Sequence, residues 1–230
     1  MAGRPKERNG RRQTQSPNGS GVQPSPQSIP SHRSARAPLQ RRALQTKELL
    51  ISNAKALFLA RGYTATTVDD IVEVSKVSRA SFYTYFSSKR EIMIVAGHDS
   101  RHHGWELLED FGRLNLRENH DELIEWLKEY FDFLEAHGGY MLTWQQAALQ
   151  DAELRTMGMR AQQKAIRIFC ASLRAQGATV PEPDLMVRAL AIRSMLDRFW
   201  YHWWFTKTQF RQNQVFDNLA SLMLSMIRAE

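Results

Sequence analysis

Three helix-start signals lie within residues 62–93, and their spacing leaves room only for short helices joined by tight turns. Thr67 and Asp70 form a Thr-x-x-Asp capping box, in which each side chain satisfies a backbone N–H at the start of a helix. Ser78 is placed to cap a second helix, and Ser88 with a glutamate three residues later forms another capping box. The sequence therefore predicts two short helices joined by a turn, with a further helix beginning just after them.

The short helix that follows Ser78 has two unlike faces. Phe82 and Phe86 lie four residues apart, so they share one face that we expect to be buried. The outward face combines a charge, a small side chain and a phenol ring, and it consists of Arg79, Ala80, Tyr83 and Thr84. A helix-turn-helix unit places the N-terminal residues of such a helix against base edges in the major groove of DNA.

The positive charge of the chain is concentrated at its N-terminal end. The formal net charge is +7, of which residues 1–42 carry +8, residues 43–98 carry +2 and residues 99–230 carry −3. Because the cation excess adjoins the helix with the outward polar face, it indicates a polyanionic partner for that end only.

Residues 1–42 differ in composition from the rest of the chain. They are rich in Pro, Gly, Ser, Gln and Arg, hold six of the eight prolines and have hardly any large apolar residue. Such a segment cannot bury enough surface to offset the entropy lost on ordering, so we expect a disordered basic arm.

From about Leu44 almost to its end the chain has helical periodicity, and no segment alternates as a strand would. Gly62 is placed to end the first helix in the left-handed conformation. In the second helix Ile71 is expected to face inward, together with Val74 or Ser75.

Glycines punctuate the later helical segments. The helix that begins after Ser88 is expected to bend or break near Gly97 and Gly104, and Gly138-Gly139 and residues 177–183 separate the segments that follow. These later helices are expected at about 121–137, 143–151, 153–176, 184–207 and 212–229. The sequence thus predicts an all-α fold of about nine helices.

The motifs of residues 62–92 resemble the DNA-binding domain of the TetR (tetracycline-repressor) family. The pattern Gly-Tyr-x-x-Thr-Thr-Val-x-x-Ile starts at Gly62, Val-Ser-x-x-Ser-Phe-Tyr-x-Tyr-Phe starts at Val77, and Ser-Lys-x-x-Ile starts at Ser88. The resemblance covers roughly residues 44–95. It implies a basic arm at 1–42, a TetR-like helix-turn-helix domain at 43–95, and a helical effector-binding and dimerisation domain at 96–230.

Two features of the turn depart from the family pattern. Lys76 occupies the turn position usually held by glycine, so it must adopt a left-handed or strained backbone, or the turn differs slightly. Val74 and Ser75, just before it, are also atypical. Neither departure removes a residue of the outward face.

The resemblance and the geometry of helix-turn-helix docking give the residues of this domain separate roles. Arg79 can pair with guanine O6 and N7, Ala80 allows close approach to a thymine methyl, and Tyr83 can contact a thymine methyl or a phosphate. The resemblance also implies phosphate contacts, which it places on or near Thr67, Ser81, Thr84, Tyr85 and Lys89. The structural alternative is that Arg79 and the tyrosines merely solvate a small three-helix core.

The basic arm offers two further contacts with DNA. Arg41 and Arg42 directly precede the first helix and are placed to reach a flanking minor groove. Gly3-Arg4-Pro5-Lys6 resembles part of an AT-hook whose first arginine is replaced by Ala2. The alternative is a solvated cationic tail that raises non-specific affinity for DNA through counterion release.

The last two predicted helices are the expected dimer surface, because one small DNA-binding unit makes too few contacts for a specific site. Residues 199–205 are apolar nearly all round, which indicates burial on more than one side. The family resemblance implies a four-helix bundle built from two copies. The expected dimer contacts are Leu196, Phe199, Trp203, Phe216, Leu219 and Met223.

The resemblance also implies a ligand pocket bounded by the middle helices. The candidate wall residues are bulky and mostly aromatic, and they are Trp105, Trp126, Tyr130, Tyr140, Met141, Trp144, Gln145 and Trp200. Each residue alone is more typical of plain core, but together they favour a bulky apolar or aromatic effector. Binding would act by population shift between two spacings of the DNA-reading helices.

Other classes of function find little support in the sequence. The single Cys170 excludes an internal disulfide and is typical of a small buried side chain in a reducing cytoplasm. There is no run of about 18 apolar residues for a membrane span. His98 and His102 are spaced to share a metal, but no third ligand is fixed, so we expect no metal and no cofactor. No Ser/His/Asp set, phosphate-binding Gly loop or paired carboxylates indicate an enzyme.

The sequence therefore predicts a cytoplasmic, homodimeric regulator of transcription that binds double-stranded DNA at two-fold related half-sites. The leading hypothesis is a repressor released by a small apolar or aromatic effector. The alternative is a constitutive DNA-binding regulator or activator without an effector, its pocket filled by tryptophan side chains. The effector, the operator sequence and the regulated genes are not encoded in any motif of the chain.

Overall fold

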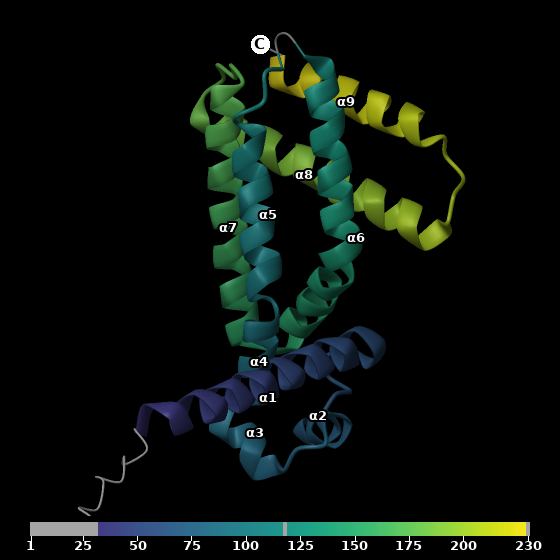
Figure 1. The fold of residues 1–230 in the computed structure, drawn as a ribbon. Helices are drawn as coiled ribbons and strands as arrows, with labels where there is room; N and C mark the ends of the chain where they lie inside the picture. The colour runs from purple at the N-terminus through teal and green to yellow at the C-terminus, as the bar shows by residue number, and fades with distance from the viewer. Residues whose placement is uncertain (1–31, 117–118, 229–230) are drawn as a thin grey trace, which may run out of the picture. The chain divides into compact units, whose positions relative to one another are not determined.

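The computed structural model describes residues 32–116 and 119–228, with side chains from residue 40 onward. These residues form nine α-helices and no strand (Figure 1). The helices are α1 (His32–Arg61), α2 (Val68–Ser75), α3 (Arg79–Tyr85), α4 (Lys89–Ala96), α5 (His98–Phe111), α6 (His120–Gln150), α7 (Ala152–Ala175), α8 (Glu182–Thr206) and α9 (Gln212–Arg228). The prediction of an all-α fold is confirmed.

The chain divides into two compact units, residues 1–40 and residues 41–230. Of the first unit only the helical backbone of residues 32–40 is described. Helix α1 thus begins at His32 rather than after the predicted basic arm at 1–42. The composition of residues 1–42 as a whole is typical of disorder, whereas Ala, Arg, Leu and Gln around Pro38 are good helix formers. The rest of the arm, including Gly3-Arg4-Pro5-Lys6, lies outside the described residues.

Two hydrophobic cores hold the second unit together. One core joins the buried side of α1 to those of α2, α3 and α4, with Leu50, Phe58, Ile71 and Phe82 wholly inaccessible to solvent. The other core fills the space among α5 to α9. The two are not independent, because α6 and α7 also contribute to the first core, through Tyr140, Ala147 and Leu154.

The first core fixes where the N-terminal helices end and turn. Gly62 ends α1 at a φ of 81°, and its N–H donates to the carbonyl of Phe58 at 2.9 Å, as predicted for a glycine C-cap. In α2 Ser75 is buried while Val74 is half exposed, which decides between the two inward-facing candidates. Cys170 is a free, buried thiol in the second core, and burial raises its pKa.

The chain breaks between α4 and α5 at Gly97, one of the two expected positions. It does not break at Gly104, which lies inside α5 against the ring of Phe133. A Cβ at Gly104 would lie 3.0 Å from Cζ of that ring. This glycine therefore serves the close approach of α5 to α6 rather than a hinge.

The predicted break at Gly138-Gly139 is wrong, because α6 continues through both residues. The reason is tertiary packing. A Cβ on Gly138 would lie 2.6 Å from Cζ3 of Trp200 and would overlap the indole. Gly138 therefore lets α8 cross close to α6, and the helix accepts the entropic cost of a glycine for that contact.

Helices α8 and α9 pack against α6 and against each other. Four of the six predicted dimer contacts are buried within this single chain, and they are Leu196, Phe216, Leu219 and Met223. Phe199 and Trp203 are partly buried at the edge of the same core. The apolar stripes identified from the sequence thus face the core of their own chain, because α6 presents an apolar face to them.

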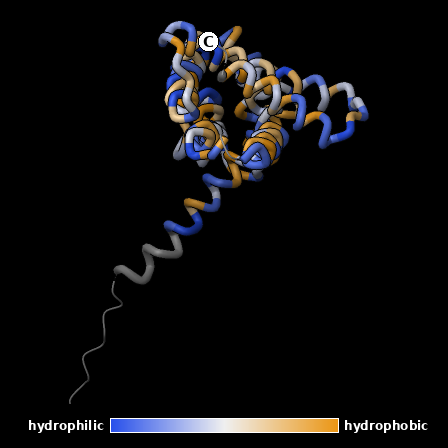
Figure 2. The backbone as a smooth tube through the Cα atoms, turned by 90° about the horizontal axis from the view of Figure 1, so that it is seen from above, coloured by the Kyte–Doolittle hydropathy of each residue, from blue (hydrophilic) through white to orange (hydrophobic). Residues whose placement is uncertain are grey.

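Hydrophobic and hydrophilic residues are interleaved along each helix when the molecule is viewed from above (Figure 2). This is the pattern of amphipathic helices that bury one side. Among the described residues, none of the helices combines the length and the apolar character that crossing a membrane requires.

Replacing Gly138 by alanine tests the crossing of α6 and α8. The added methyl group must displace the buried indole of Trp200, so we expect a loss of about 1–3 kcal/mol of unfolding free energy in urea denaturation. The matched control is Gly139→Ala, whose Cβ would meet only the tip of the half-exposed Leu59 at 3.2 Å. That variant should be neutral or gain up to about 1 kcal/mol, because alanine favours the helix. Equal losses in both variants would contradict the assignment.

Candidate functional site

Both ends of α2 are set by local features that the sequence predicts. The amide of Asp70 donates to Oγ1 of Thr67 at 3.1 Å, and the amide of Thr67 donates to Oδ2 of Asp70 at 2.7 Å, so the capping box is complete. Hydrogen bonds from the Thr67 hydroxyl and from the Thr67 amide hold the pKa of the Asp70 carboxyl below its usual range. At the other end of α2, Lys76 is left-handed, with φ 54° and ψ 39°.

The left-handed Lys76 lets the chain reverse after a single residue. Its N–H donates to the carbonyl of Glu73 at 3.1 Å, and the N–H of Val77 donates to the carbonyl of Val72 at 3.1 Å. The turn therefore has the geometry that glycine would adopt, at the cost of a strained β-carbon. Of the two predicted alternatives, the left-handed backbone is confirmed.

Helix α3 has the two faces that the sequence predicts. Ser78 caps it by accepting the N–H of Ser81 at 3.0 Å, and Phe82 and Phe86 are buried on one side. The opposite face is open to solvent and consists of Arg79, Ala80, Tyr83 and Thr84. Arg79 and Tyr83 are thus not part of the core, as they would be if they served only to complete a three-helix unit.

Arg79 is positioned by two neighbours. Its Nη1 donates to Oδ1 of Asp69 at 2.7 Å, and its guanidinium lies 5.9 Å from the centre of the Tyr83 ring. The Tyr83 hydroxyl and Asp69 together raise the pKa of Arg79. Because both partners of the ion pair are well exposed, the pair contributes little stability and is readily exchanged for another acceptor.

Lys89, predicted to contact a phosphate, makes contacts within the protein that the sequence does not predict. Its ammonium group donates to the carbonyls of Tyr63 and Thr66 at 2.8 and 2.7 Å and lies 4.3 Å from the centre of the Tyr63 ring. Burial lowers its pKa. Two of its three N–H donors therefore tie α4 to the loop between α1 and α2, which sequence spacing alone could not show.

The remaining predicted DNA contacts lie at the surface to different extents. Arg41, Arg42 and Thr67 are exposed, whereas Ser81 and Tyr85 are half buried. The capping box expected at Ser88 is only half formed. Ser88 accepts the N–H of Glu91 at 3.2 Å, but the Glu91 carboxylate receives the amide and hydroxyl of Ser87 instead.

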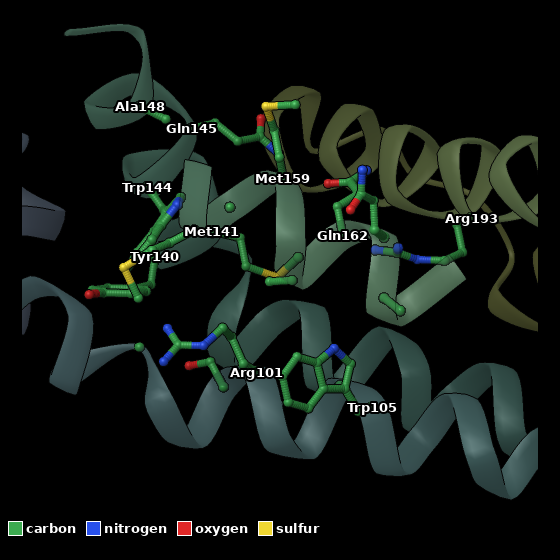
Figure 3. A pocket seen from close by; sticks show the side chains of 18 of the residues that line it. Arg101, Trp105, Tyr140, Met141, Trp144, Gln145, Ala148, Met159, Gln162 and Arg193 are labelled. Atoms are coloured by element: carbon green, nitrogen blue, oxygen red, sulfur yellow. The ribbon is translucent and has the colours of Figure 1, made fainter. Parts of the chain in front are cut away.

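A cavity of about 520 Å³ opens among α5, α6 and α7 (Figure 3). Six of the eight predicted wall residues line it, and they are Trp105, Tyr130, Tyr140, Met141, Trp144 and Gln145. The other two do not. Trp126 is buried in the core, where its Nε1 donates to the carbonyl of Leu107 at 2.8 Å. Trp200 packs against Gly138, outside the cavity.

Three arginines line the cavity that the sequence analysis did not select, namely Arg101, Arg155 and Arg193. Charged side chains are typical of exposed surfaces, so spacing alone does not mark these arginines as wall residues. The sequence around Arg193 does indicate that this residue is buried. It follows Ile192 in an apolar stripe of α8, where a charge is out of place unless it has a partner.

Arg193 belongs to a buried polar group with Tyr130 and Asp197. The Tyr130 hydroxyl donates to Oδ1 of Asp197 at 2.7 Å, and Nη2 of Arg193 lies 3.7 Å from Oδ2 of the same carboxylate. Burial raises the pKa of Tyr130 and that of Asp197, the latter opposed by the nearby guanidinium. A phenol and a cation thus hold this carboxylate below the cavity floor.

Two cavity residues also hold the C-terminal end of α4. The Tyr140 hydroxyl donates to the carbonyl of Met93, and burial raises its pKa. Nη1 and Nη2 of Arg101 lie 3.4 and 3.3 Å from the carbonyl of Ile94, and the Arg101 guanidinium lies 5.5 Å from the Trp144 ring centre. Helix α4 therefore ends directly on the wall of the cavity.

The N-terminal end of α4 is held by the turn between α6 and α7. Arg90 pairs with Asp151 at 2.7 Å through Nε and with Glu153 at 2.5 Å through Nη1. A further hydrogen bond joins the Thr64 hydroxyl, in the loop before α2, to Oε1 of Gln150 at 3.0 Å. The helices that carry the outward face of α3 are thus fastened to those that enclose the cavity.

No metal centre is formed within the part of the chain that the structure describes. His98 and His102 face each other with ring centres 5.8 Å apart, but no group of three or more His, Cys, Asp or Glu side chains gathers around a common point.

The helices of the first core match a family of known proteins. Residues 50–96 match the family described as bacterial regulatory proteins, tetR family. The HTH-type transcriptional regulator TcmR of Streptomyces glaucescens is 41% identical over 56 residues, which are 24% of this chain and 25% of that protein. The negative transcriptional regulator IcaR of the biofilm operon icaADBC in Staphylococcus aureus (strain Newman) is 44% identical over 46 residues, 20% of this chain and 25% of that protein. The chain thus spans about a quarter of the length of these curated relatives.

Solved structures share the fold over most of the chain. A transcriptional regulator of Aquifex aeolicus VF5 has a TM-score of 0.60 at 20% identity, with 78% of this chain and 98% of that one covered. A putative fatty acid metabolism regulator of Clostridium perfringens has a TM-score of 0.58 at 21% identity, with 79% and 100% covered. At such identities the likeness concerns the fold, which these regulators have in common with this chain.

Replacing Lys76 by glycine tests the strained turn. Glycine adopts the left-handed conformation without a clashing β-carbon, so we expect a gain of about 1 kcal/mol in unfolding free energy, partly offset by the greater freedom of the unfolded chain. Chemical denaturation followed by circular dichroism measures it. Lys76→Ala removes the same charge but keeps a β-carbon, and it should bring no such gain. A gain of similar size in both variants would show that the charge, not the backbone, is responsible.

Proposed function

We propose that this chain, a DNA-binding transcriptional regulator of the TetR family, acts as a homodimeric repressor that a small molecule releases from its operator. The observation that carries the proposal is the solvent-exposed face of α3, with Arg79 and Tyr83 outward and Phe82 and Phe86 anchored behind them. The family is one of transcriptional regulators and not of enzymes.

The contacts with DNA divide into two kinds. We assign Arg79 and Ala80, at the N-terminal end of α3, to base edges in the major groove. In the free protein Asp69 holds the Arg79 guanidinium extended along the surface, so the side chain is partly ordered before it meets a base. Thr67, Tyr83 and Thr84 are exposed around it and are suited to phosphates or to thymine methyl groups.

We rank Ser81, Tyr85 and Lys89 below the exposed residues as candidates for contacts with phosphates. Ser81 and Tyr85 are half buried, and the Lys89 ammonium group donates two hydrogen bonds to backbone carbonyls. We therefore assign Lys89 chiefly to holding the loop that presents Thr67. Arg41 and Arg42 are exposed on α1 and remain assigned to a flanking minor groove.

The dimer surface is proposed on α8 and α9, on the sides left exposed by the core. Large apolar side chains gather there, namely Met186, Val187, Leu190, Trp204, Phe205, Phe210 and Leu222. Phe199 and Trp203 border this surface, whereas Leu196, Phe216, Leu219 and Met223 support it from inside. A two-fold axis through it would pair like helices of two copies and would remove apolar surface that a monomer exposes to water.

The cavity supports the effector-responsive form of the proposal over the constitutive alternative. A constitutive regulator was expected to fill this space with tryptophan side chains, yet Trp105 and Trp144 line about 520 Å³ of open volume. That size suits a drug-sized molecule. The apolar and aromatic walls fit the predicted bulky apolar or aromatic effector.

Helix α4 is the proposed route of coupling. Its C-terminal carbonyls are held by Tyr140 and Arg101, which are themselves wall residues, and Arg90 holds its N-terminal turn. A ligand that moves either wall residue also moves the end of α4, and α4 shares a core with α3. The ligand and DNA then favour different positions of α4, which is the differential affinity that coupling requires.

Replacing Arg79 or Tyr83 by alanine tests the DNA-binding face. We expect footprinting on the DNA that surrounds the chain's own coding region to locate a site for the unmodified protein. Each variant should lose about 1–3 kcal/mol of binding free energy per half-site, which corresponds to at least a tenfold weaker affinity. Fluorescence anisotropy with the protected fragment measures it. Retained affinity in both variants would overturn the proposal.

Arg160→Ala is the matched control, because it removes an exposed arginine that belongs to α7 and not to the helix-turn-helix unit. It should bind the same fragment as the unmodified protein does, apart from a small salt-dependent change. Sedimentation velocity and circular dichroism on all three variants should show an unchanged dimer and unchanged helicity, so that any loss of affinity is assigned to the contact itself.

Replacing Tyr140 by phenylalanine tests the coupling through α4. The variant keeps the ring but leaves the buried carbonyl of Met93 without its donor, so we expect a loss of about 1–3 kcal/mol of unfolding free energy together with a changed affinity for DNA. Urea denaturation and anisotropy are the two measurements. Tyr201→Phe is the control, since no described residue accepts a hydrogen bond from the Tyr201 hydroxyl. A stability loss with unaltered DNA affinity would show that Tyr140 is structural only.

A further inference from the structure

The wall of the cavity carries an excess of positive charge. Arg101, Arg155 and Arg193 line it, and no aspartate or glutamate does. Asp197 offsets Arg193 from behind the wall, but within the described chain no carboxylate pairs with Arg101 or Arg155. Burial lowers the pKa of Arg101, which is the mark of a cation held partly away from water without an acidic partner. An aromatic cavity intended for a neutral molecule would not need this charge.

Arg193 has donors without acceptors. Its residue is only 9% exposed, yet its Nε and Nη1 have no hydrogen-bond partner among the described residues. The guanidinium extends from α8 toward Gln162 on α7 and enters the cavity (Figure 3). A buried donor left unpaired lowers the stability of the fold, and more so when the group is charged. An acceptor that enters the cavity would remove this cost.

Asp197 does not satisfy the guanidinium. One of its oxygens receives the Tyr130 hydroxyl at 2.7 Å, and the other lies 3.7 Å from Nη2 of Arg193, beyond hydrogen-bonding distance. The carboxylate therefore partly balances the charge of the arginine, but it accepts no hydrogen bond from Nε or Nη1.

A second unpaired donor lies at the other end of the cavity. Nε1 of Trp144 is buried and has no partner among the described residues. Figure 3 shows Trp144 beside Arg101 and Tyr140, with Met141 between this group and Arg193. The cavity thus presents a donor at each end and aromatic and thioether side chains between them.

We propose that the effector of this cavity is an aromatic organic anion, whose carboxylate or equally acidic oxygen accepts a hydrogen bond from Nε or Nη1 of Arg193. The ring system lies between Trp105, Met141 and Trp144, and an acceptor oxygen at its far end receives the Trp144 N–H. The proposal rests on the function proposed above for the cavity, and it narrows the effector from a bulky apolar molecule to a charged one.

An anion fits better than a neutral acceptor for two reasons. An anionic acceptor adds a direct Coulomb attraction to the guanidinium, which a neutral acceptor lacks, and this attraction is strong where water is excluded. A negative charge also balances the half-buried Arg101 at the same wall, whereas Arg155 is exposed to water. Flat aromatic walls, in turn, favour a ring system over a flexible alkyl chain, since stacked rings lose little conformational freedom on binding.

The test compares three probes on the purified full-length protein by isothermal titration calorimetry at pH 7. The probes are 9-anthracenecarboxylate, the uncharged 9-anthracenecarboxamide, and dodecanoate, an anion without a ring. We expect the aromatic carboxylate to bind at least tenfold more tightly than either of the others. A tighter amide would overturn the anion, a tighter dodecanoate would overturn the aromatic ring system, and no binding by any probe would overturn the proposal as a whole.

Variants locate the preference on Arg193. Arg193→Met should reduce the preference for carboxylate over amide to below threefold. That change leaves the buried Asp197 carboxylate without its cationic partner and could cause misfolding. The double variant Arg193→Met with Asp197→Asn removes both charges and avoids this problem. Arg167→Gln, an exposed arginine of α7 outside the cavity, should keep the full preference. A preference that survives in the double variant would overturn the role of Arg193.

DNA binding of the same preparations separates this proposal from the proposed function. If the protein binds the footprinted fragment and a neutral aromatic releases it, the repressor function stands and the anionic effector falls. If the protein binds no duplex, the repressor function falls, whichever probe the cavity prefers.

Discussion

The arrangement of the two hydrophobic cores depends on the hydrogen bond from the Tyr140 hydroxyl to the carbonyl of Met93. It places a residue of the cavity wall in the same core as the helices that carry Arg79, so that the two cores share a boundary instead of a flexible linker. Gly97, at the end of α4, is pressed against the same ring, since a Cβ there would lie 2.8 Å from Cε1 of Tyr140. A larger residue would force the ring away. The close approach of α4 to α6 therefore requires glycine at this position and a phenol opposite to it.

What the sequence predicts well is local. Thr67 with Asp70, and Ser78 with Ser81, satisfy backbone groups within three residues of themselves, so their roles follow from spacing alone. Lys76 belongs to the same class, because a chain that must reverse between two capped helices has few backbone conformations available. The outward face of α3 also follows from spacing, once Phe82 and Phe86 fix the inward side. These short-range constraints specify the DNA-reading unit almost completely, and the match of residues 50–96 to the TetR family agrees with them.

What the sequence predicts poorly depends on contacts between distant segments. Gly138-Gly139 has the composition of a break, yet Trp200, far along the chain, makes the glycine a packing requirement inside α6. The apolar stripe that contains Leu196 packs in the core of its own chain. Hydrophobic periodicity alone cannot distinguish such a core from an interface between copies. Lys89 has the place of a phosphate ligand, but the carbonyls of the α1–α2 loop come within 2.8 Å of its ammonium. In each case the deciding partner is remote in sequence.

The unpaired donors of the cavity are best understood against the rest of the polar groups. Elsewhere in the described chain buried side-chain donors are matched, as Trp126 is by Leu107 and Ser172 by Leu108. The exceptions, Nε1 of Trp144 and two nitrogens of Arg193, both lie on one cavity. Native proteins contain few buried donors without a hydrogen-bond partner. Those that remain mark sites where binding is favoured at a cost in stability. Under the proposed function, a bound effector would complete the donors that are left unpaired at both ends of this single space. Since Tyr140 and Arg101 border that same space, its occupation and the position of α4 cannot be set independently.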